Sequence, residues 1–125
     1  MNKLAIFFIL FASYVMYSGF VYTKGTTSDL SFPEKDQLSI RQGKELFQQN
    51  NCSSCHQLYG LGGYLGPDLT TAWSDKRRGE VYIRAMLKSG SNRMPQYGFG
   101  ENEIDALVSY LRYIDTTAIT YKSIQ

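Results

Sequence analysis

The sequence predicts an all-α protein with a single membrane-spanning helix at its amino terminus and one small helical domain after it. Three observations favour this class. The chain opens with a long apolar run that carries no charge, three later segments repeat apolar residues at helical spacing, and no segment alternates apolar and polar residues for long enough to indicate a strand. We assign an anchor to residues 1–23, a linker to 24–38, a domain to 39–118 and a tail to 119–125.

The amino-terminal run is long enough to cross a bilayer. At about 1.5 Å per residue, residues 4–22 make roughly 28 Å of helix, close to the roughly 30 Å thickness of the hydrocarbon core. Lys3 and Lys24 flank the run. The alternative is a cleaved signal peptide with residues 4–12 as its apolar region. The run continues well beyond residue 12 without an evident small-residue cleavage site, so we expect a retained anchor.

A polar linker is expected after the anchor, because residues 24–38 contain Gly25 and Pro33 and show no sustained apolar period. Charge is nearly balanced along the chain, with 13 Lys and Arg against 11 Asp and Glu. This composition gives no indication of nucleic acid binding. Residues 76–78 (Lys-Arg-Arg) form the only basic run, for which a solvated turn is the simplest interpretation.

Three helices are expected in the domain. The first covers residues 39–50, with Ser39 as its N-cap. The second covers residues 79–89, and Gly90 follows as a stop signal. The third covers residues 101–115, where apolar side chains recur on one face and acidic side chains at the start suit the helix dipole.

The loop between the first two helices carries the chemistry. Residues 51–78 make a long loop for a compact domain, which indicates that it binds or encloses something. It contains Cys52, Cys55 and His56 in the order C-x-x-C-H, the attachment motif of c-type haem. Two cysteines at this spacing can each form a thioether to one porphyrin vinyl group, and the following imidazole reaches the iron.

Two other interpretations of the motif are weaker. A thioredoxin-like redox pair needs a strand before the motif, whereas a helix is expected there. A zinc site needs four ligands, whereas the chain contains 2 cysteines and 1 histidine. The only histidine of the sequence, His56, therefore occupies the position of the motif that binds haem iron.

Met94 is the expected sixth ligand of the iron. It lies in a loop before the last helix, and Pro95 restricts its backbone to an extended conformation that leaves the side chain free. Thioether ligation raises the reduction potential and favours electron transfer over catalysis. Met86 is the alternative, but it falls within a helical apolar pattern, where a methionine more often fills the core.

Other residues are expected to support the haem. An iron-bound histidine usually donates its second ring N–H to a carbonyl, and we assign that carbonyl to Pro67. Arg93 and the basic run at residues 76–78 are candidates for pairing with haem propionates or for steering an acidic donor. Trp73 is either a core residue or a propionate partner.

These features resemble class I cytochromes c. The shared pattern is a helix that ends in Asn-Asn, the C-x-x-C-H motif, Gly-Pro-Asp-Leu, an Arg-Met-Pro loop and a final helix with L-x-x-Y-L. In that fold the first and last helices cross. The residues expected at the crossing are Gly43, Phe47, Leu107, Tyr110 and Leu111.

A closer match covers nearly the whole chain. The membrane helix, the short linker, the glycine- and tyrosine-rich loop after the haem motif and the Met-Pro-Gln sequence resemble the small cytochrome c subunit of bacterial nitric oxide reductase. The positions that carry this resemblance are Cys52, Cys55, His56, Leu58, Gly60, Gly62, Tyr64, Pro67, Leu69, Met94, Pro95 and Gln96. The loop and Met-Pro-Gln are more specific than the haem motif, which many cytochromes carry.

The resemblance implies a non-catalytic electron-transfer subunit with one covalent haem c. A soluble cytochrome or cupredoxin outside the cytoplasm would donate electrons to it. It would pass them to a large polytopic haem-containing catalytic subunit that reduces nitric oxide to nitrous oxide. The chain would be a single-pass protein of the bacterial inner membrane with its haem domain on the periplasmic side, where haem is attached.

The same resemblance implies a second role for the glycine-rich loop. In the family, the backbone at positions matching Gly62 and Tyr64 faces the catalytic subunit and helps to hold a shared Ca²⁺, an ion that accepts carbonyl ligands. On this interpretation, Gly62→Val weakens assembly and leaves the haem spectrum nearly intact. The simpler interpretation is that the glycines let the chain turn around the haem edge while Tyr59 and Tyr64 pack on the porphyrin.

Other functions stay open. The chain is alternatively a free membrane-tethered cytochrome that shuttles electrons between respiratory complexes, or a subunit of a haem-copper oxidase. A haem peroxidase or ligand sensor is a third class, and it requires an open position at the iron, which a methionine ligand would close.

Overall fold

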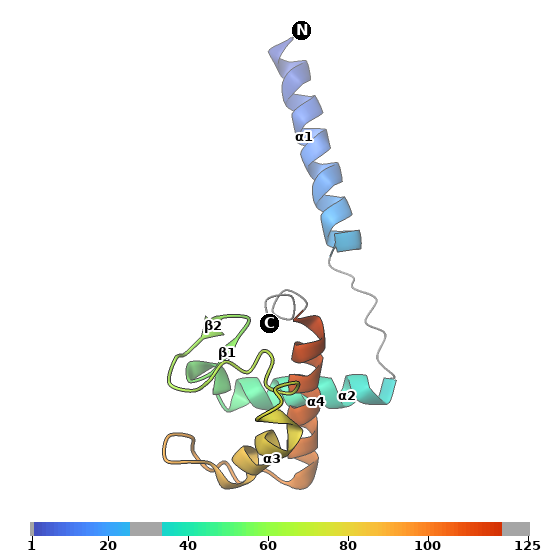
Figure 1. The fold of residues 1–125 in the computed structure, drawn as a ribbon. Coiled ribbons are helices and arrows are strands. Elements are labelled where there is room, and N and C mark those ends of the chain that lie inside the picture. The colour runs from blue at the N-terminus through green and yellow to red at the C-terminus, as the bar shows by residue number, and fades with distance from the viewer. Residues whose placement is uncertain (1, 26–33, 119–125) are drawn as a thin grey trace. The chain divides into compact units, whose positions relative to one another are not determined.

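The computed structural model describes residues 2–25 and 34–118, and its chain divides into two units, Met1–Ser31 and Phe32–Gln125. The element order is shown in Figure 1. The expected tail at residues 119–125 and most of the expected linker lie outside the described residues. The domain boundaries therefore stay a prediction.

The first unit contains one apolar helix. α1 (Lys3–Phe20) continues into a π-helical turn, η1 (Val21–Gly25), and none of the residues of α1 is buried. The most apolar 18-residue window within Lys3–Thr23 has a mean hydropathy of 2.1. At the far end, the Thr23 hydroxyl donates to the Gly19 carbonyl at 2.6 Å. The helix is long and apolar enough to span a membrane, as the sequence predicts.

The second unit confirms the predicted all-α domain. Its helices are α2 (Glu34–Gln49), α3 (Gly79–Ser89) and α4 (Glu101–Thr117). α3 has the bounds that the sequence predicts. Gly90 ends it with a positive φ of 66° and an N–H that donates to the Met86 carbonyl, as expected of a glycine stop.

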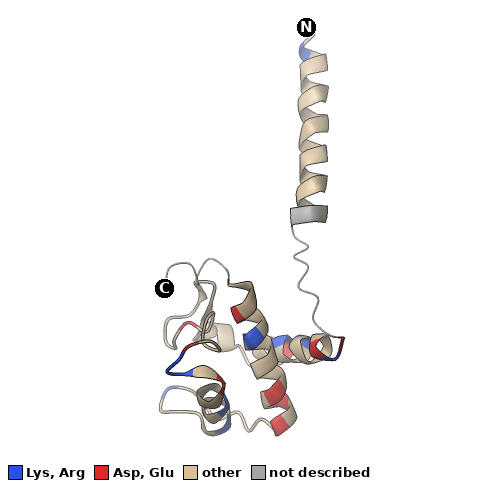
Figure 2. Cartoon of the chain, turned by 45° about the vertical axis from the view of Figure 1, so that its right-hand side comes forward, with Lys and Arg blue, Asp and Glu red and all other residues tan. Residues whose placement is uncertain are grey.

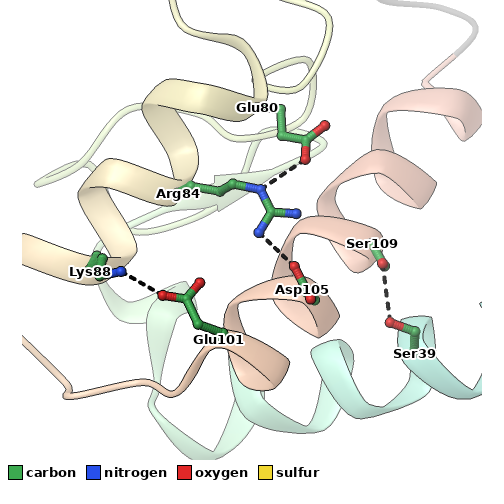
Figure 3. Close-up of polar contacts among 7 residues, drawn as sticks. All are labelled: Ser39, Glu80, Arg84, Lys88, Glu101, Asp105 and Ser109. Carbon is green, nitrogen blue, oxygen red and sulfur yellow. Dashed lines mark hydrogen bonds and ion pairs between the residues drawn. The ribbon is translucent and has the colours of Figure 1, made fainter.

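The predicted start of the first domain helix is wrong. α2 already includes Glu34, so residues 34–38 are helical rather than part of a linker. Glu34 and Asp36 lie in its first turn, where acidic side chains are stabilised by the helix dipole. Ser39 lies inside the helix instead of capping it, and its hydroxyl donates to the Ser109 hydroxyl on α4 at 3.1 Å (Figure 3).

α2 and α4 cross, as the resemblance to class I cytochromes c implies (Figure 1). The contact depends on Gly43, because a Cβ atom there would lie 2.5 Å from the Ala106 carbonyl carbon and 2.8 Å from the Tyr110 Cβ. One turn later, the ring centroids of Phe47 and Tyr110 lie 5.6 Å apart. The missing side chain at Gly43 therefore allows backbone contact between the helices.

The core lies between the helices, and α4 contributes most of it. α3 adds Ile83 and Leu87, and α2 adds Phe47. The buried apolar residues on α4 are Ile104, Ala106, Leu107, Val108, Tyr110, Leu111 and Ile114. This is the apolar face that the sequence pattern predicts for the last helix.

The long loop after α2 contains a small hairpin that the sequence pattern does not predict. β1 (Gln57–Leu58) pairs antiparallel with β2 (Leu61–Gly62), with Gln57 opposite Gly62 and Leu58 opposite Leu61. Tyr59 and Gly60 have positive φ values of 54° and 77°. Two positive values in a two-residue connection are typical of tight hairpin turns. Strands of two residues are too short to show alternation.

Ion pairs on the surface join α3 to α4 (Figure 3). Arg84 donates to Glu80 on its own helix at 2.8 Å and to Asp105 on α4 at 2.6 Å. Lys88 lies 2.5 Å from Glu101 at the start of α4. The pairs are partly or fully exposed, so each stabilises the fold little. Together they fix the two ends of the loop that carries Met94.

Candidate haem site

A cavity of about 270 Å³ lies among the loop after α2, the helix α3 and the loop after α3. Its wall is mostly apolar. The residues with an expected role at the haem that line it are Cys52, Cys55, His56, Pro67, Arg93 and Met94. Residues from two loops far apart in the sequence therefore meet at one cavity.

The C-x-x-C-H segment is wound into a tight turn. Asn51 adopts a left-handed conformation with φ of 50°, and η2 (Cys52–Ser54) follows as a 3-10 turn. The Cys52 carbonyl accepts the N–H groups of Cys55, at 3.2 Å, and of His56, at 2.9 Å. Burial raises the pKa of the Cys52 thiol. The turn thus brings both thiols and the imidazole to the same cavity.

The ring of His56 is fixed in orientation. Its Nδ1–H donates to the Pro67 carbonyl at 2.9 Å, the contact that the sequence predicts. Gly66 packs against the ring, since a Cβ atom there would lie 2.5 Å from Cε1 and 2.6 Å from Nδ1. In a neutral imidazole, protonation at Nδ1 leaves the lone pair on Nε2. Nε2 is therefore the atom available to bind a metal.

The glycines of the hairpin pack against the haem-attachment turn itself. Gly62 has φ of 132°, and a Cβ atom there would overlap the His56 carbonyl. A Cβ atom at Gly63 would overlap the Ser54 carbonyl oxygen and lie 2.5 Å from the carbon. The Gly63 N–H donates to the Ser53 carbonyl at 2.9 Å. This packing argues against the expectation that Gly62→Val spares the haem spectrum, because a side chain there would displace the His56 backbone.

The contacts of the two tyrosines give no support to the simpler interpretation, in which they pack on the porphyrin. Tyr59 and Tyr64 are not among the described residues that line the cavity. The Tyr59 hydroxyl reaches the end of α4, where it donates to the Ile114 carbonyl at 3.3 Å and hydrogen-bonds the Thr117 hydroxyl. Tyr64 points outward, with 87% of its surface exposed. Tyr59 therefore anchors the hairpin, whereas Tyr64 is available to a partner.

The loop that carries Met94 is closed by a short turn. The Ser91 N–H donates to the Met94 carbonyl at 2.9 Å, and the Met94 N–H donates to the Ser91 hydroxyl at 3.2 Å. Gly90 allows this turn to lie against the end of α3, since a Cβ atom there would lie 2.7 Å from the Met94 carbonyl oxygen. The backbone of Met94 is therefore fixed by its contacts with Ser91 and Gly90.

Two side chains beyond Met94 hold the rest of the loop. The Gln96 amide donates to the Lys88 carbonyl at 3.2 Å, and the Tyr97 hydroxyl donates to the Asn50 carbonyl at 3.4 Å. Burial raises the pKa of Tyr97, and the nearby thiols Cys52 and Cys55 raise it further. The sequence did not predict this role for Tyr97. The only signal that it offers is a tyrosine three residues after Met94.

Met86 is not simply a core residue. It lines the cavity together with Met94, as Ile83 and Leu87 also do, but unlike those two it does not belong to the buried core cluster. The expectation that Met86 fills the core is therefore wrong in this respect. Both thioethers are within the wall of the cavity, and Met94 as the axial ligand remains a proposal.

Arg78 is the member of the basic run that lines the cavity. Its Nε donates to Asp75 at 2.7 Å. Hydrogen bonds from the Arg77 N–H and then from the Arg78 side chain lower the pKa of Asp75. Trp73 packs against the core, and the guanidinium carbon of Arg112 lies 5.3 Å from the centre of its ring. The buried Trp73 indole N–H has no hydrogen-bond partner among the described residues, so both the core role and the propionate role stay open.

This donor set fits a c-type haem. Two thiols and an imidazole of fixed orientation meet one or two thioether sulfurs at a mostly apolar cavity. Two arginines in the same wall, Arg78 and Arg93, suit the negative charge of propionates. The residues present therefore match the group that the motif implies.

Comparison with known proteins agrees with this site. The family described as cytochrome c oxidase, cbb3-type, subunit III matches residues 38–111. The C subunit of nitric oxide reductase from Halomonas halodenitrificans is 29% identical over 121 residues, covering 87% of this chain and 78% of that protein. The protein of the same name from Stutzerimonas stutzeri is 31% identical over 107 residues, covering 71% and 73%.

Another relative is matched over a smaller part of its own length. Cytochrome c oxidase subunit 2 of Alkalihalophilus pseudofirmus is 29% identical over 104 residues, which cover 73% of this chain but 30% of that protein. The two nitric oxide reductase proteins instead match along most of their own length. The chain therefore belongs to the cytochrome c subunits of bacterial nitric oxide reductase, and it is an electron-transfer cytochrome with an apolar helix able to span a membrane.

Proposed function

We propose that the chain receives electrons from a soluble donor and passes them to the catalytic subunit of a membrane nitric oxide reductase. The observation that carries the proposal is the His56 ring, hydrogen-bonded to Pro67 beside the two thiols and the Met94 loop. A histidine fixed in this way beside thioether sulfur suits electron transfer rather than catalysis at an open iron.

Each residue has a stated role in this proposal. Cys52 and Cys55 form the two thioethers to one haem, and His56 Nε2 and the Met94 sulfur bind its iron. The bound haem supplies one-electron transfer. Arg93 and Arg78 lie in the cavity wall, and either suits a propionate.

The partner and the orientation follow from the same proposal. The catalytic subunit is a large polytopic haem protein in the bacterial inner membrane, and the haem domain of this chain lies on the periplasmic side. The donor is a soluble cytochrome or cupredoxin. The two relatives named as the C subunit of nitric oxide reductase support such a complex.

A calcium ion shared with the catalytic subunit remains part of the proposal at Gly62 and Tyr64. The described residues contain no group of three His, Cys, Asp or Glu side chains that could hold a metal ion. Calcium would therefore need oxygen ligands from the partner as well. The exposed Tyr64 and the neighbouring Leu61, 76% exposed, suit burial in such an interface.

The ligand assignment is tested with Met94→Ala and Met86→Ala in the full chain. We expect the ferric protein to show a sulfur-to-iron absorption band at the red end of the visible spectrum. Met94→Ala should abolish it, and Met86→Ala should keep it. The opposite result would assign the ligand to Met86, and absence of the band from the unaltered protein would favour an open site.

The complex is tested by purification from native membranes in mild detergent. We expect a polytopic haem protein to co-purify and to consume nitric oxide when the chain is reduced. A monomeric chain would instead support a free tethered carrier. Oxygen consumption without nitric oxide reduction would support a haem-copper oxidase, which the match to an oxidase subunit 2 keeps as the second candidate.

A further inference from the structure

We propose that the mouth of the cavity docks an acidic electron-donor protein through a basic rim formed by Lys76, Arg77 and Arg93. This inference rests on the proposed function, because it concerns the donor of that same pathway. It names the charge of the partner and the surface that receives it. The inference depends on charge, exposure and the position of the cavity.

The charges at the cavity have one sign. Arg78 and Arg93 belong to its wall, and no Asp or Glu is among the described residues that line it. Lys76 and Arg77 are exposed in the same short turn as Arg78. In Figure 2, acidic residues gather at the start of α4, and basic residues lie on the loops as well as on the helices.

The acidic side chains nearest in sequence are already paired. Asp75 accepts from the Arg78 side chain and from the Arg77 N–H, at 2.7 and 2.8 Å. Glu80 accepts from Arg84 at 2.8 Å. No ion pair among the described residues includes Lys76 or Arg77. Their charge therefore remains available to an external anionic group.

Apolar side chains complete the rim. Leu65, Tyr82 and Tyr97 all line the cavity, yet 72%, 46% and 38% of their surfaces are exposed. A small apolar centre with surrounding charge suits a transient encounter, because charge raises the association rate and a small apolar contact permits fast release. This is what an electron donor requires, since it must leave after each transfer.

A permanent partner fits the basic rim less well than it fits the hairpin. Leu61 and Tyr64 at the hairpin are highly exposed and apolar, and no Lys or Arg occurs between residues 45 and 75. Stable interfaces are more hydrophobic than transient ones. We therefore assign the hairpin to the catalytic subunit and the basic rim to the donor. In each encounter one electron leaves the reduced centre of the donor and reduces the ferric iron, and no atom or proton is transferred.

The test reverses two charges of the rim and compares them with two charges elsewhere. Lys76→Glu with Arg77→Glu is the rim variant, and Lys35→Glu with Lys44→Glu on α2 is the control with the same change in net charge. All four side chains are exposed, and none of them lines the cavity. The probes are an acidic blue-copper protein and a basic c-type cytochrome, each titrated against the detergent-solubilised full chain at low and high salt.

We expect the rim variant to bind the acidic copper protein roughly tenfold more weakly at low salt, and the control to change little. High salt should remove the difference. Oxidation of the reduced chain by hexacyanoferrate(III) should slow in the rim variant, and oxidation by the cation tris(phenanthroline)cobalt(III) should accelerate. Equal effects in rim and control variants, or preferred binding of the basic cytochrome, would overturn the proposal.

Two other occupants of the rim give different outcomes. If the rim variant loses the co-purifying polytopic protein and binds the copper protein as before, the rim is the permanent interface. If it loses only binding to vesicles that contain phosphatidylglycerol, the rim faces the membrane. Either result refutes a donor site. The proposed function itself fails separately, through the Met94→Ala spectrum or the purification, neither of which involves Lys76 or Arg77.

Discussion

The two sides of the cavity are held in different ways. On the His56 side, backbone packs directly on backbone, with Gly62 and Gly63 against the attachment turn and Gly66 against the imidazole ring. On the Met94 side, a single close backbone approach at Gly90 is supplemented by side-chain hydrogen bonds from Gln96 and Tyr97, which hold a loop between two helices. The first arrangement has no room for adjustment. The second can yield at modest cost.

This difference suits the different bonds that a haem would make on the two sides of the cavity. Covalent attachment and the histidine bond need a fixed geometry, which short-range backbone contacts supply. A methionine bond is weaker, and the loop that presents it can adapt to its partner. Substitutions on the two sides should therefore have effects of different size and kind.

The largest effect is expected from Gly63→Ala on the His56 side. The new Cβ atom would overlap the Ser54 carbonyl, so the attachment turn must move. We expect a loss of at least about 3 kcal/mol of unfolding free energy, at the upper end of typical overpacking costs. We also expect little covalent haem, as judged by haem staining of denatured protein and by denaturant titration.

Gly100→Ala is the matched control for that experiment. A Cβ atom at Gly100 would meet only Glu103 Oε2, at 3.8 Å, and neither glycine has a φ in the left-handed region. We expect nearly normal haem content. If Gly63→Ala also keeps its haem and stability, the His56 side is more compliant than its packing indicates.

A smaller effect is expected from Gly90→Ala on the Met94 side, and it should concern methionine ligation rather than haem attachment. Alanine disfavours the φ of 66°, and its Cβ atom would lie 2.7 Å from the Met94 carbonyl oxygen. We expect about 1–2 kcal/mol of destabilisation. Covalent haem should remain while the sulfur-to-iron band weakens. Loss of covalent haem would show that the two sides are not independent.

The smallest effect is expected from Tyr97→Phe. It removes one hydroxyl that donates to the Asn50 carbonyl at 3.4 Å, a long hydrogen bond near the surface. We expect at most about 1 kcal/mol of lost stability in thermal unfolding, with haem attachment unchanged. A larger loss, or a loss of attached haem, would mean that Tyr97 supports the cysteine turn as well as the Met94 loop.

Sequence reasoning succeeded where a local pattern has one physical solution. The apolar face of α4 and the Gly90 stop of α3 follow from the residue pattern, and the contact between His56 and Pro67 follows from the second N–H of an iron-bound histidine. The structure contains all three. The α2–α4 contact at Gly43 came from the family resemblance instead. It would have been hard to derive from periodicity, because a glycine gives no apolar signal.

The errors arose where tertiary contacts decide the outcome. Ser39 has a good N-cap side chain, yet the acidic residues before it extend the helix. The packing of Gly62 and Gly63 on the attachment turn was not predicted, since sequence cannot show which backbone a glycine approaches. Met86 has the spacing of a core residue, but it lies at the part of α3 that lines the cavity.

The contact between Tyr59 and the end of α4 has a consequence for biogenesis. The hairpin over the attachment turn is anchored at Ile114 and Thr117, which are synthesised long after Cys52 and Cys55. Until α4 emerges and docks, the hairpin lacks that anchor. The turn that carries the two thiols is therefore less protected until the last helix has folded against the hairpin.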